Sequence, residues 1–205
     1  MSVVIAVKDP KTGSISVGCD SQVSVGNIKY KLKGESSKIW RYNNLPIVIV
    51  GGVGSLRDIQ LAQTCHDLID ELSLYKGHVD FEYCVTTLYT RLHKLFLDNG
   101  RVPLDIKGNP TPTIGSQFLL AVGEHAFTID IDGAIDELSD YLVIGSGAEV
   151  AIGVLENNKN KSAKQRIKEA IQACADKTLY VNNDIKILST YDTISKSLLE
   201  GNKNE

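Results

Sequence analysis

The sequence of 205 residues predicts an α+β fold, a four-layer αββα sandwich in which two antiparallel sheets pack face to face between two pairs of helices. Two observations predict this class. Strand-like segments occur in hairpin-like groups, and segments with helical periodicity occur in pairs, in the order strands, two helices, strands, two helices, strand. No change in composition marks a linker, so we expect one domain over residues 1–205, with a frayed polar tail over about 198–205.

The chain opens with two predicted hairpins. Residues 2–8 are rich in Val and Ile, Asp9-Pro-Lys-Thr-Gly13 has turn chemistry, and residues 14–19 alternate polar and apolar side chains. Residues 37–41 and 46–50 predict a second pair of strands. The second of these runs into Gly51-Gly-Val-Gly54, a segment typical of a strand that ends in a turn.

Two helices should follow. From Ser55, a plausible N-cap, apolar residues recur at helical spacing as far as a stop at Gly77. A second apolar stripe covers residues 81–97. Residues 101–115 contain three prolines and predict a loop.

The second half repeats the pattern. Strands are predicted over residues 116–122, 126–131 and 141–144, and helices over 148–156 and 162–176, the latter with Ser162 as its cap. Residues 184–188 are the last predicted strand.

Composition excludes several classes of protein. A net charge of -3 and a pI near 5.8 provide no basic face for nucleic acid, and no apolar run is long enough to span a membrane. The apolar start is too short for a signal peptide, and the four cysteines lack the spacing of a disulfide framework or a zinc site. We therefore expect a cytoplasmic protein that binds neither nucleic acid nor membranes.

Ser2 is a candidate nucleophile because of its place in the chain. Initiator methionine is removed when the second residue is small, and removal of Met1 would leave an α-amine beside the Ser2 hydroxyl. An α-amine has a pKa of about 7.7–8.0, so it can accept the proton of the hydroxyl near neutral pH. The simpler interpretation is an ordinary strand residue.

Five motifs in register give Ser2 a context: Cys19-Asp-Ser-Gln-Val-Ser-Val-Gly-Asn27, Lys33-Gly-Glu-Ser-Ser-Lys-Ile39, Val50-Gly-Gly-Val-Gly54, Ile144-Gly-Ser-Gly147 and Ala175-Asp-Lys-Thr-Leu-Tyr-Val-Asn-Asn183. Together they resemble the proteasome β-subunit family, and most closely the HslV-like peptidases, which carry GDGQVSLGN-like and KGNARK-like segments. The resemblance runs from Ser2 to about Leu188 and weakens from about Tyr75 to Gly115. The resemblance implies the four-layer αββα sandwich fold of the N-terminal nucleophile hydrolases.

The resemblance implies a role for four residues in the first half. Ser2 matches the nucleophile, where the family usually has threonine. Asp20 matches a buried acid and Lys38 a buried lysine that lowers the pKa of the nucleophile's hydroxyl. Gly51 matches the glycine whose backbone N–H binds the oxyanion. Without the family context, Asp20 would be interpreted as a turn residue and Lys38 as a surface lysine.

The second half supplies further implied positions. Ser146 matches a serine near the amine of the nucleophile, and Asp176 matches a later aspartate that helps to orient that amine. HslV-like chains can also hold Na⁺ or another cation on backbone carbonyls, here those of Ala175, Thr178 and Val181. No cofactor is otherwise implied.

The resemblance implies a peptidase of the threonine or serine N-terminal nucleophile type, which cleaves polypeptides inside a homo-oligomeric ring of six or seven subunits, either as one ring or as two stacked rings. It also implies an AAA+ unfoldase as partner. Two alternatives stay open. The chain would be a non-catalytic ring subunit if Met1 is retained, and an N-terminal nucleophile amidase for small amides if it does not assemble.

Overall fold

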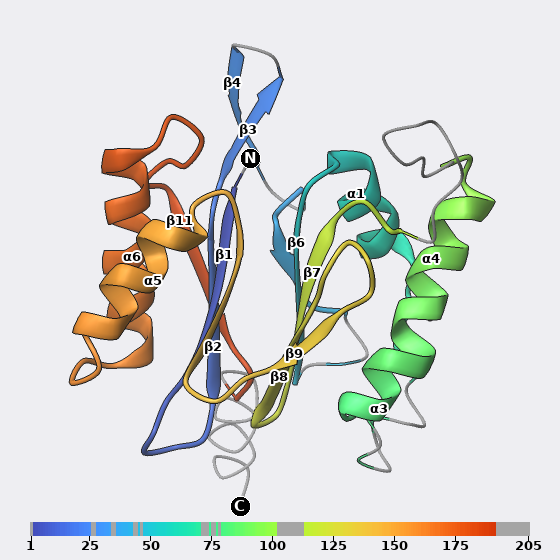
Figure 1. The fold of residues 1–205 in the computed structure, drawn as a ribbon, viewed down its shortest axis with the longest axis horizontal. Helices are drawn as coiled ribbons and strands as arrows, with labels where there is room; N and C mark the ends of the chain where they lie inside the picture. The colour runs from blue at the N-terminus through green and yellow to red at the C-terminus, as the bar shows by residue number, and fades with distance from the viewer. Residues whose placement is uncertain are drawn as a thin grey trace, which may run out of the picture.

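The computed structural model describes residues 2–25, 28–33, 36–42, 45, 47–70, 74, 77, 79–101 and 113–191. Figure 1 shows that these residues form four layers, with two sheets in the middle and helices on both outer sides. The predicted αββα sandwich is therefore confirmed. Most of the predicted loop over residues 101–115 and the predicted frayed tail over 198–205 lie outside the described residues.

The first sheet contains the start of the chain. Its strand order is β10-β1-β2-β11, and neighbouring strands are antiparallel. The strands are β1 (Val3–Lys8), β2 (Ile15–Asp20), β10 (Tyr141–Gly145) and β11 (Ile185–Ser189). The pairing of Val3 with Gly145 places the N-terminal end of β1 beside the C-terminal end of β10.

The second sheet has the order β5-β6-β7-β8-β9, again antiparallel. Its strands are β5 (Ile39–Trp40), β6 (Val48–Val53), β7 (Gln117–Val122), β8 (His125–Ile129) and β9 (Ile135–Glu137). β9 was absent from the sequence-based prediction, which assigns no element between residues 131 and 141.

The helices cover the outer faces of the sheets. They are α1 (Leu56–Thr64), α3 (Phe81–Tyr83), the π-helical turn η1 (Cys84–Leu88), α4 (Tyr89–Asp98), α5 (Ala148–Asn157) and α6 (Ala163–Lys177). In Figure 1, α5 and α6 lie against the sheet that contains β1, while α1 and α4 lie against the other sheet.

β1 shows why a strand in this fold is apolar throughout. Successive side chains point to opposite faces of a sheet. Val3, Ile5 and Val7 pack in the cluster that includes residues of α5 and α6, whereas Val4 and Ala6 pack in the cluster between the two sheets. Because both faces of β1 are covered, polar alternation would leave polar groups in a core.

The helix predicted from Ser55 to Gly77 is much shorter in the structure. α1 ends at Thr64, whose hydroxyl donates to the carbonyl of Gln60, and the following residues turn. The turn brings Leu68 and Ile69 into the core. Leu68 and Ile69 are therefore apolar because an irregular segment buries them. Their spacing along the chain happens to match that of a helix.

A projecting hairpin was also missing from the prediction. β3 (Gln22–Val25) and β4 (Ile28–Lys31) form a separate two-stranded sheet that extends beyond the sandwich at the top of Figure 1. All four residues of β4 are exposed. An isolated hairpin is marginally stable in water, so this element depends on its connections to the sandwich.

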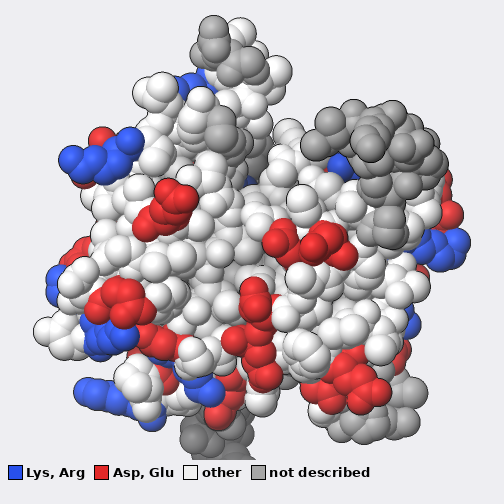
Figure 2. Space-filling model, viewed as in Figure 1, with Lys and Arg blue, Asp and Glu red and all other residues white. Residues whose placement is uncertain are grey.

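The surface carries charges of both signs. On the face in Figure 2, Lys and Arg side chains lie among Asp and Glu side chains and do not gather into one basic area. Among the described residues, no helix combines the length and the apolar composition that crossing a membrane requires.

Candidate active site

A cavity of about 200 Å³ lies at the start of β1. Its wall combines Ser2 with residues of β3, of the segment between β4 and β5, of the turn after β6 and of the first turn of α1. The lining residues are Ser2, Val23, Ser24, Val25, Leu32, Lys38, Gly54, Leu56 and Ile59. The cavity thus brings a hydroxyl and a lysine amine to the edge of a largely apolar recess.

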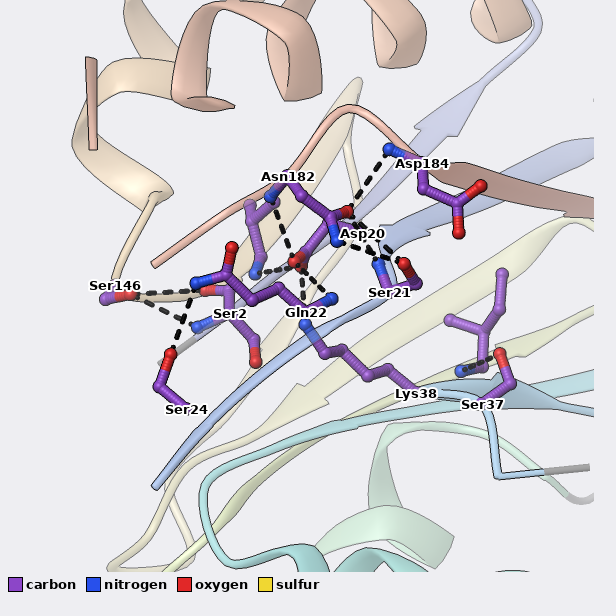
Figure 3. Close-up of polar contacts among 12 residues, drawn as sticks. Ser2, Asp20, Ser21, Gln22, Ser24, Ser37, Lys38, Ser146, Asn182 and Asp184 are labelled. Carbon is purple, nitrogen blue, oxygen red and sulfur yellow. Dashed lines mark hydrogen bonds and ion pairs between the residues drawn. The ribbon is translucent and has the colours of Figure 1, made fainter. Parts of the chain in front are cut away.

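Lys38 and Asp20 form a buried ion pair beside this cavity. Lys38 Nζ lies 2.6 Å from Asp20 Oδ1, and the two side chains are 2% and 0% exposed. Figure 3 shows Lys38 reaching Asp20 from one side while Ser2 lies on another. Two charges are removed from water only at a large cost, so each depends on the other for compensation.

Asp20 also gathers three backbone segments. Its carboxylate accepts the N–H of Val3 at 3.2 Å, of Gln22 at 3.0 Å and of Asn182 at 3.4 Å. Hydrogen bonds to an ionised carboxylate are stronger than those between neutral groups. Asp20 therefore holds the starts of β1 and β3 and the connection from α6 to β11 around one ion pair.

Burial changes the protonation behaviour of the neighbouring groups. Desolvation lowers the pKa of Lys38 below its usual value, and attraction to Asp20 opposes that shift. Desolvation also raises the pKa of Cys19 to about 11, so its thiol stays neutral near pH 7. Cys19 is buried and packs as a small apolar side chain in the core between the two sheets.

Ser146 lies beside the main-chain nitrogen of Ser2. The Ser2 N–H donates to Ser146 Oγ at 3.2 Å, and Ser146 Oγ lies 3.4 Å from the Ser2 carbonyl oxygen. Gly145 makes this approach possible. Its φ is +100°, and a Cβ there would lie 2.2 Å from the Ser2 carbonyl oxygen.

The structure does not bring Gly51 to the cavity. Gly51 lies inside β6, where it pairs with Ile39 and Leu119, and a Cβ there would contact Val4 in the core between the sheets. Gly54, three residues further along, lines the cavity with Ser2. The cavity wall thus includes Gly54 of this Gly-rich segment, and the absence of a side chain at Gly51 allows close packing between the sheets. The role predicted for the Gly51 N–H stays a prediction.

Asp176 is also separated from the cavity. It is exposed on α6, where Gln172 Nε2 donates to its Oδ1 at 2.8 Å. It lines a surface hollow with Lys168 and Ile185 on the helical side of the sheet. Helical periodicity explains this outcome, because Cys174 occupies the buried face of α6 and Asp176 the outer one.

The three residues predicted to offer carbonyl oxygens to a cation lie where α6 ends. Ala175 is in the last turn, Thr178 is the C-cap, and Val181 follows in the connection to β11. The hydroxyl of Thr178 is buried and has no hydrogen-bond partner among the described residues. Carbonyl oxygens at a helix C-terminus carry partial negative charge, so these residues fit an oxygen-coordinated cation.

Two residues of the site were missed by sequence reasoning. Asn182 accepts the Ser21 N–H at 3.2 Å, and its own N–H reaches Asp20. Gln22 donates through Nε2 to the Leu179 carbonyl at 2.8 Å. Both lie inside the quoted motifs, but their amide side chains signal no chemistry by themselves. Only the contact between two distant segments makes them part of the site (Figure 3).

A family model for proteasome subunits matches residues 4–189. The chain belongs to the proteasome subunit family. This membership confirms the resemblance drawn from the five motifs. Because the match begins at residue 4, it does not include Ser2.

Solved structures of similar fold agree with this family. Thiobacillus denitrificans BPH in complex with epoxomicin has a TM-score of 0.70 and 17% identity, over 91% of this chain and 97% of that chain. The same BPH protein in another structure has a TM-score of 0.70, 18% identity and coverages of 91% and 96%. Eukaryotic HslV from Trypanosoma brucei has a TM-score of 0.62 and 19% identity, with coverages of 91% and 98%. At these identities the likeness establishes the fold.

Proposed function

We propose that this proteasome-family subunit is a peptidase whose nucleophile is Ser2, exposed as the N-terminal residue when Met1 is removed. One observation carries the proposal. Ser2 and Lys38 line one small cavity, and two distant residues contact them. Asp20 pairs with Lys38, and Ser146 Oγ accepts the N–H of Ser2, so residues spread over 145 positions of the sequence are connected at this place. A serine that only filled a strand would need neither a buried ion pair nor a second serine beside its nitrogen.

The first half of the reaction forms an ester. The free α-amine of Ser2 takes the proton from Oγ, and Oγ attacks the carbonyl carbon of the substrate peptide bond. The Lys38 ammonium favours the negative charge that develops on Oγ. When the C–N bond breaks, the α-amine gives its proton to the leaving nitrogen, and the acyl group remains on Oγ.

The second half releases the acid. Water adds to the ester carbonyl while the α-amine accepts one of its protons. Breaking the ester C–O bond then returns the proton to Oγ and frees the carboxylic acid. In both halves we propose that the backbone N–H of Gly54, in place of that of Gly51, stabilises the oxyanion, because Gly54 is the glycine on the cavity wall.

We further propose that the subunits form a homo-oligomeric ring of six or seven copies and receive unfolded chains from an AAA+ unfoldase. Family membership supports the ring. The hairpin beside the cavity also exposes Val25, Ile28 and Tyr30 by 62%, 58% and 54%. Exposed apolar side chains next to each other are typical of surfaces that become covered on association. Light scattering should give a mass of at least six chains, whereas a monomer would favour the amidase alternative.

A cation at the end of α6 would be held by the carbonyls of Ala175, Thr178 and Val181. Its bound charge would stabilise the connection that carries Asn182 to Asp20. We assign it no part in the chemical steps.

The mature N-terminus provides the test of this function. Intact-mass measurement of protein purified from cells should show a chain that lacks Met1, and this protein should hydrolyse fluorogenic peptides. A chain that retains Met1 and lacks activity would favour the non-catalytic ring subunit, since the amine would then be an amide. Full activity with Met1 retained would contradict the proposed general base.

The cavity predicts a preference for apolar residues on the acyl side of the cleaved bond. A cavity of about 150 Å³ lined by apolar side chains holds benzene, and this one measures about 200 Å³. Val23, Leu32 and Ile59 give no partner to a charged side chain, and Lys38 on the same wall is already paired with Asp20. Substrates with Leu or Phe at this position should have kcat/KM at least about 10-fold above those with Asp or Lys. Equal values would show that the cavity does not bind this side chain.

The pH dependence of hydrolysis should be bell-shaped. The rate rises with pH as the Ser2 α-amine loses its proton, about pH 7.7–8.0 for an ordinary α-amine. It falls again when Lys38 loses its proton, and this happens at a pH below the usual lysine value because burial lowers the pKa of Lys38. Measuring kcat/KM from pH 5 to 11 tests both limbs. An unbroken rise through this range would exclude the charged form of Lys38 from the mechanism.

A further inference from the structure

The turn from β6 into α1 is stabilised in an unusual way. Ser55 is the N-cap residue of α1, but its side chain makes no capping hydrogen bond. In a capping box, an acidic residue at the third helical position accepts the N–H of the N-cap residue directly. Asp58 occupies that position, yet the Ser55 N–H donates to Ser116 Oγ at 3.1 Å, and Ser116 Oγ donates to Asp58 Oδ2 at 2.6 Å. Ser116, which immediately precedes β7, thus bridges the N-cap residue Ser55 and the acidic residue Asp58.

This arrangement is buried, unlike most helix caps. Asp58 is 3% exposed and Ser116 is 1% exposed. The carboxylate is compensated by the guanidinium of Arg101, which pairs with it. Arg101 in turn lies over Gly115, where a Cβ would be 1.7 Å from its Nη2. A helix cap alone does not require a buried charge, because burying a charge costs free energy. The other contacts of this network therefore indicate its purpose.

Ser116 also fixes the backbone of Gly54. The φ of Gly54 is +125°, and a Cβ there would lie 2.7 Å from Ser116 Oγ and 3.0 Å from Ser116 Cα. The backbone of Ser116 therefore packs directly against Gly54, which lines the cavity with Ser2. Ser116 Oγ also accepts the Ser55 N–H, so it restrains the peptide group that joins Gly54 to Ser55.

The next residue holds the other side of the site. Gln117 Oε1 accepts the N–H of Gly145 at 3.1 Å, and Asp130 Oδ1 accepts Gln117 Nε2 at 3.0 Å. Gly145 precedes Ser146, which contacts the Ser2 nitrogen. Adjacent residues at the start of β7 thus connect to the two turns that flank Ser2.

We propose that Ser116 and Asp58 are positioning residues, which hold the Gly54–Ser55 turn so that the backbone N–H of Gly54 faces the developing oxyanion. This inference rests on the proposed function. Both residues act through Gly54 and touch no reacting atom. Because the transition state needs this orientation more than substrate binding does, their loss should lower kcat and leave KM largely unchanged.

The test compares Ser116→Ala and Asp58→Asn with Ser16→Ala, a control that removes a hydroxyl from another buried serine, on β2. The first two variants should lower kcat at least about 10-fold with KM within about twofold. A peptide boronate, which becomes tetrahedral and anionic on a nucleophilic oxygen, should lose at least about 10-fold in affinity, whereas the matching peptide carboxamide should lose less than about twofold. Ser16→Ala should match the parent protein. Equal losses for both ligands, or an unchanged kcat, would overturn the proposal.

Hydrogen exchange tests the positioning role of Ser116 independently of whether the protein is a peptidase. If the parent protein neither cleaves peptides nor binds the boronate, the peptidase assignment fails, and the role of Ser116 is then decided by amide exchange over residues 53–59. Ser116→Ala should speed exchange of the Ser55 amide at least about 10-fold, because its acceptor is lost. Asp58→Asn, which keeps the size of the side chain, provides the same measurement if Ser116→Ala does not fold. Exchange equal to that of Ser16→Ala would show that the turn does not depend on this network.

Discussion

Ser2→Ala should reduce peptide hydrolysis by on the order of 10⁴- to 10⁶-fold while leaving the free energy of unfolding nearly unchanged. The large loss is expected because the hydroxyl is the only nucleophilic atom that the proposal uses. Stability should be retained because the Ser2 N–H, which donates to Ser146, is present in both proteins. Alanine is also small enough for removal of Met1, so the α-amine is kept. Fluorogenic peptide assays, with intact mass and urea unfolding on the same samples, measure all three properties.

Ser2→Thr is the matched control for this prediction. Threonine keeps both the hydroxyl and the α-amine, and its added methyl group restricts rotation about χ1. Activity should therefore stay within about 10-fold of the parent. Substantial hydrolysis by Ser2→Ala would remove Ser2 from the mechanism, and inactivity of every form, including Ser2→Thr, would favour a structural role in the ring.

Asp20→Ala is expected to lower the free energy of unfolding by about 3–5 kcal/mol and to abolish hydrolysis. The variant leaves the Lys38 ammonium buried without its partner. It also removes the acceptor for three backbone N–H groups. Urea unfolding measures the stability. Lys94→Ala, which breaks an exposed i,i+4 pair with Asp98, should cost less than about 1 kcal/mol.

A second change tests the physical cause of that loss. Lys38→Met removes the buried charge and keeps most of the side-chain volume. In the Asp20→Ala background it should therefore recover part of the lost stability, but no activity. The two side chains do not form a desolvated pair in solution under either of two outcomes. One is that Asp20→Ala alone lowers the free energy of unfolding by less than about 1 kcal/mol. The other is that adding Lys38→Met to Asp20→Ala lowers the free energy of unfolding further.

The residues of the site that could be predicted are those whose neighbours along the chain identify them. Asp20 and Lys38 each lie in a motif of several consecutive residues. Ser146 lies between two glycines, of which Gly145 has a positive φ and lies close to the backbone of Ser2. Asp176 and Gly51 lie in equally recognisable segments, yet Asp176 is exposed on α6, and Gly54 is the glycine of its segment that lines the cavity. A motif locates a segment, whereas helix phase and strand register determine which of its residues faces the site.

The network around Asp58 could not be predicted for a related reason. Ser55 and Asp58 have the spacing of a capping box, and nothing in the local sequence announces that Ser116 intervenes. The same applies to Asn182, which reaches Asp20 from a segment 162 positions away. Contacts of this kind arise from the packing of distant segments and leave no periodic signal.

The sequence by itself determined the order and type of most elements, the four-layer architecture and the family, because hydrophobic periodicity and turn chemistry are local properties of the chain. Only the tertiary structure decided where α1 ends, that β3 and β4 pair, and that Gly54 rather than Gly51 borders the cavity. Those outcomes depend on which face of each segment is buried. Burial is decided by the free energy of packing over the whole chain, in which each residue's own preference is one small contribution.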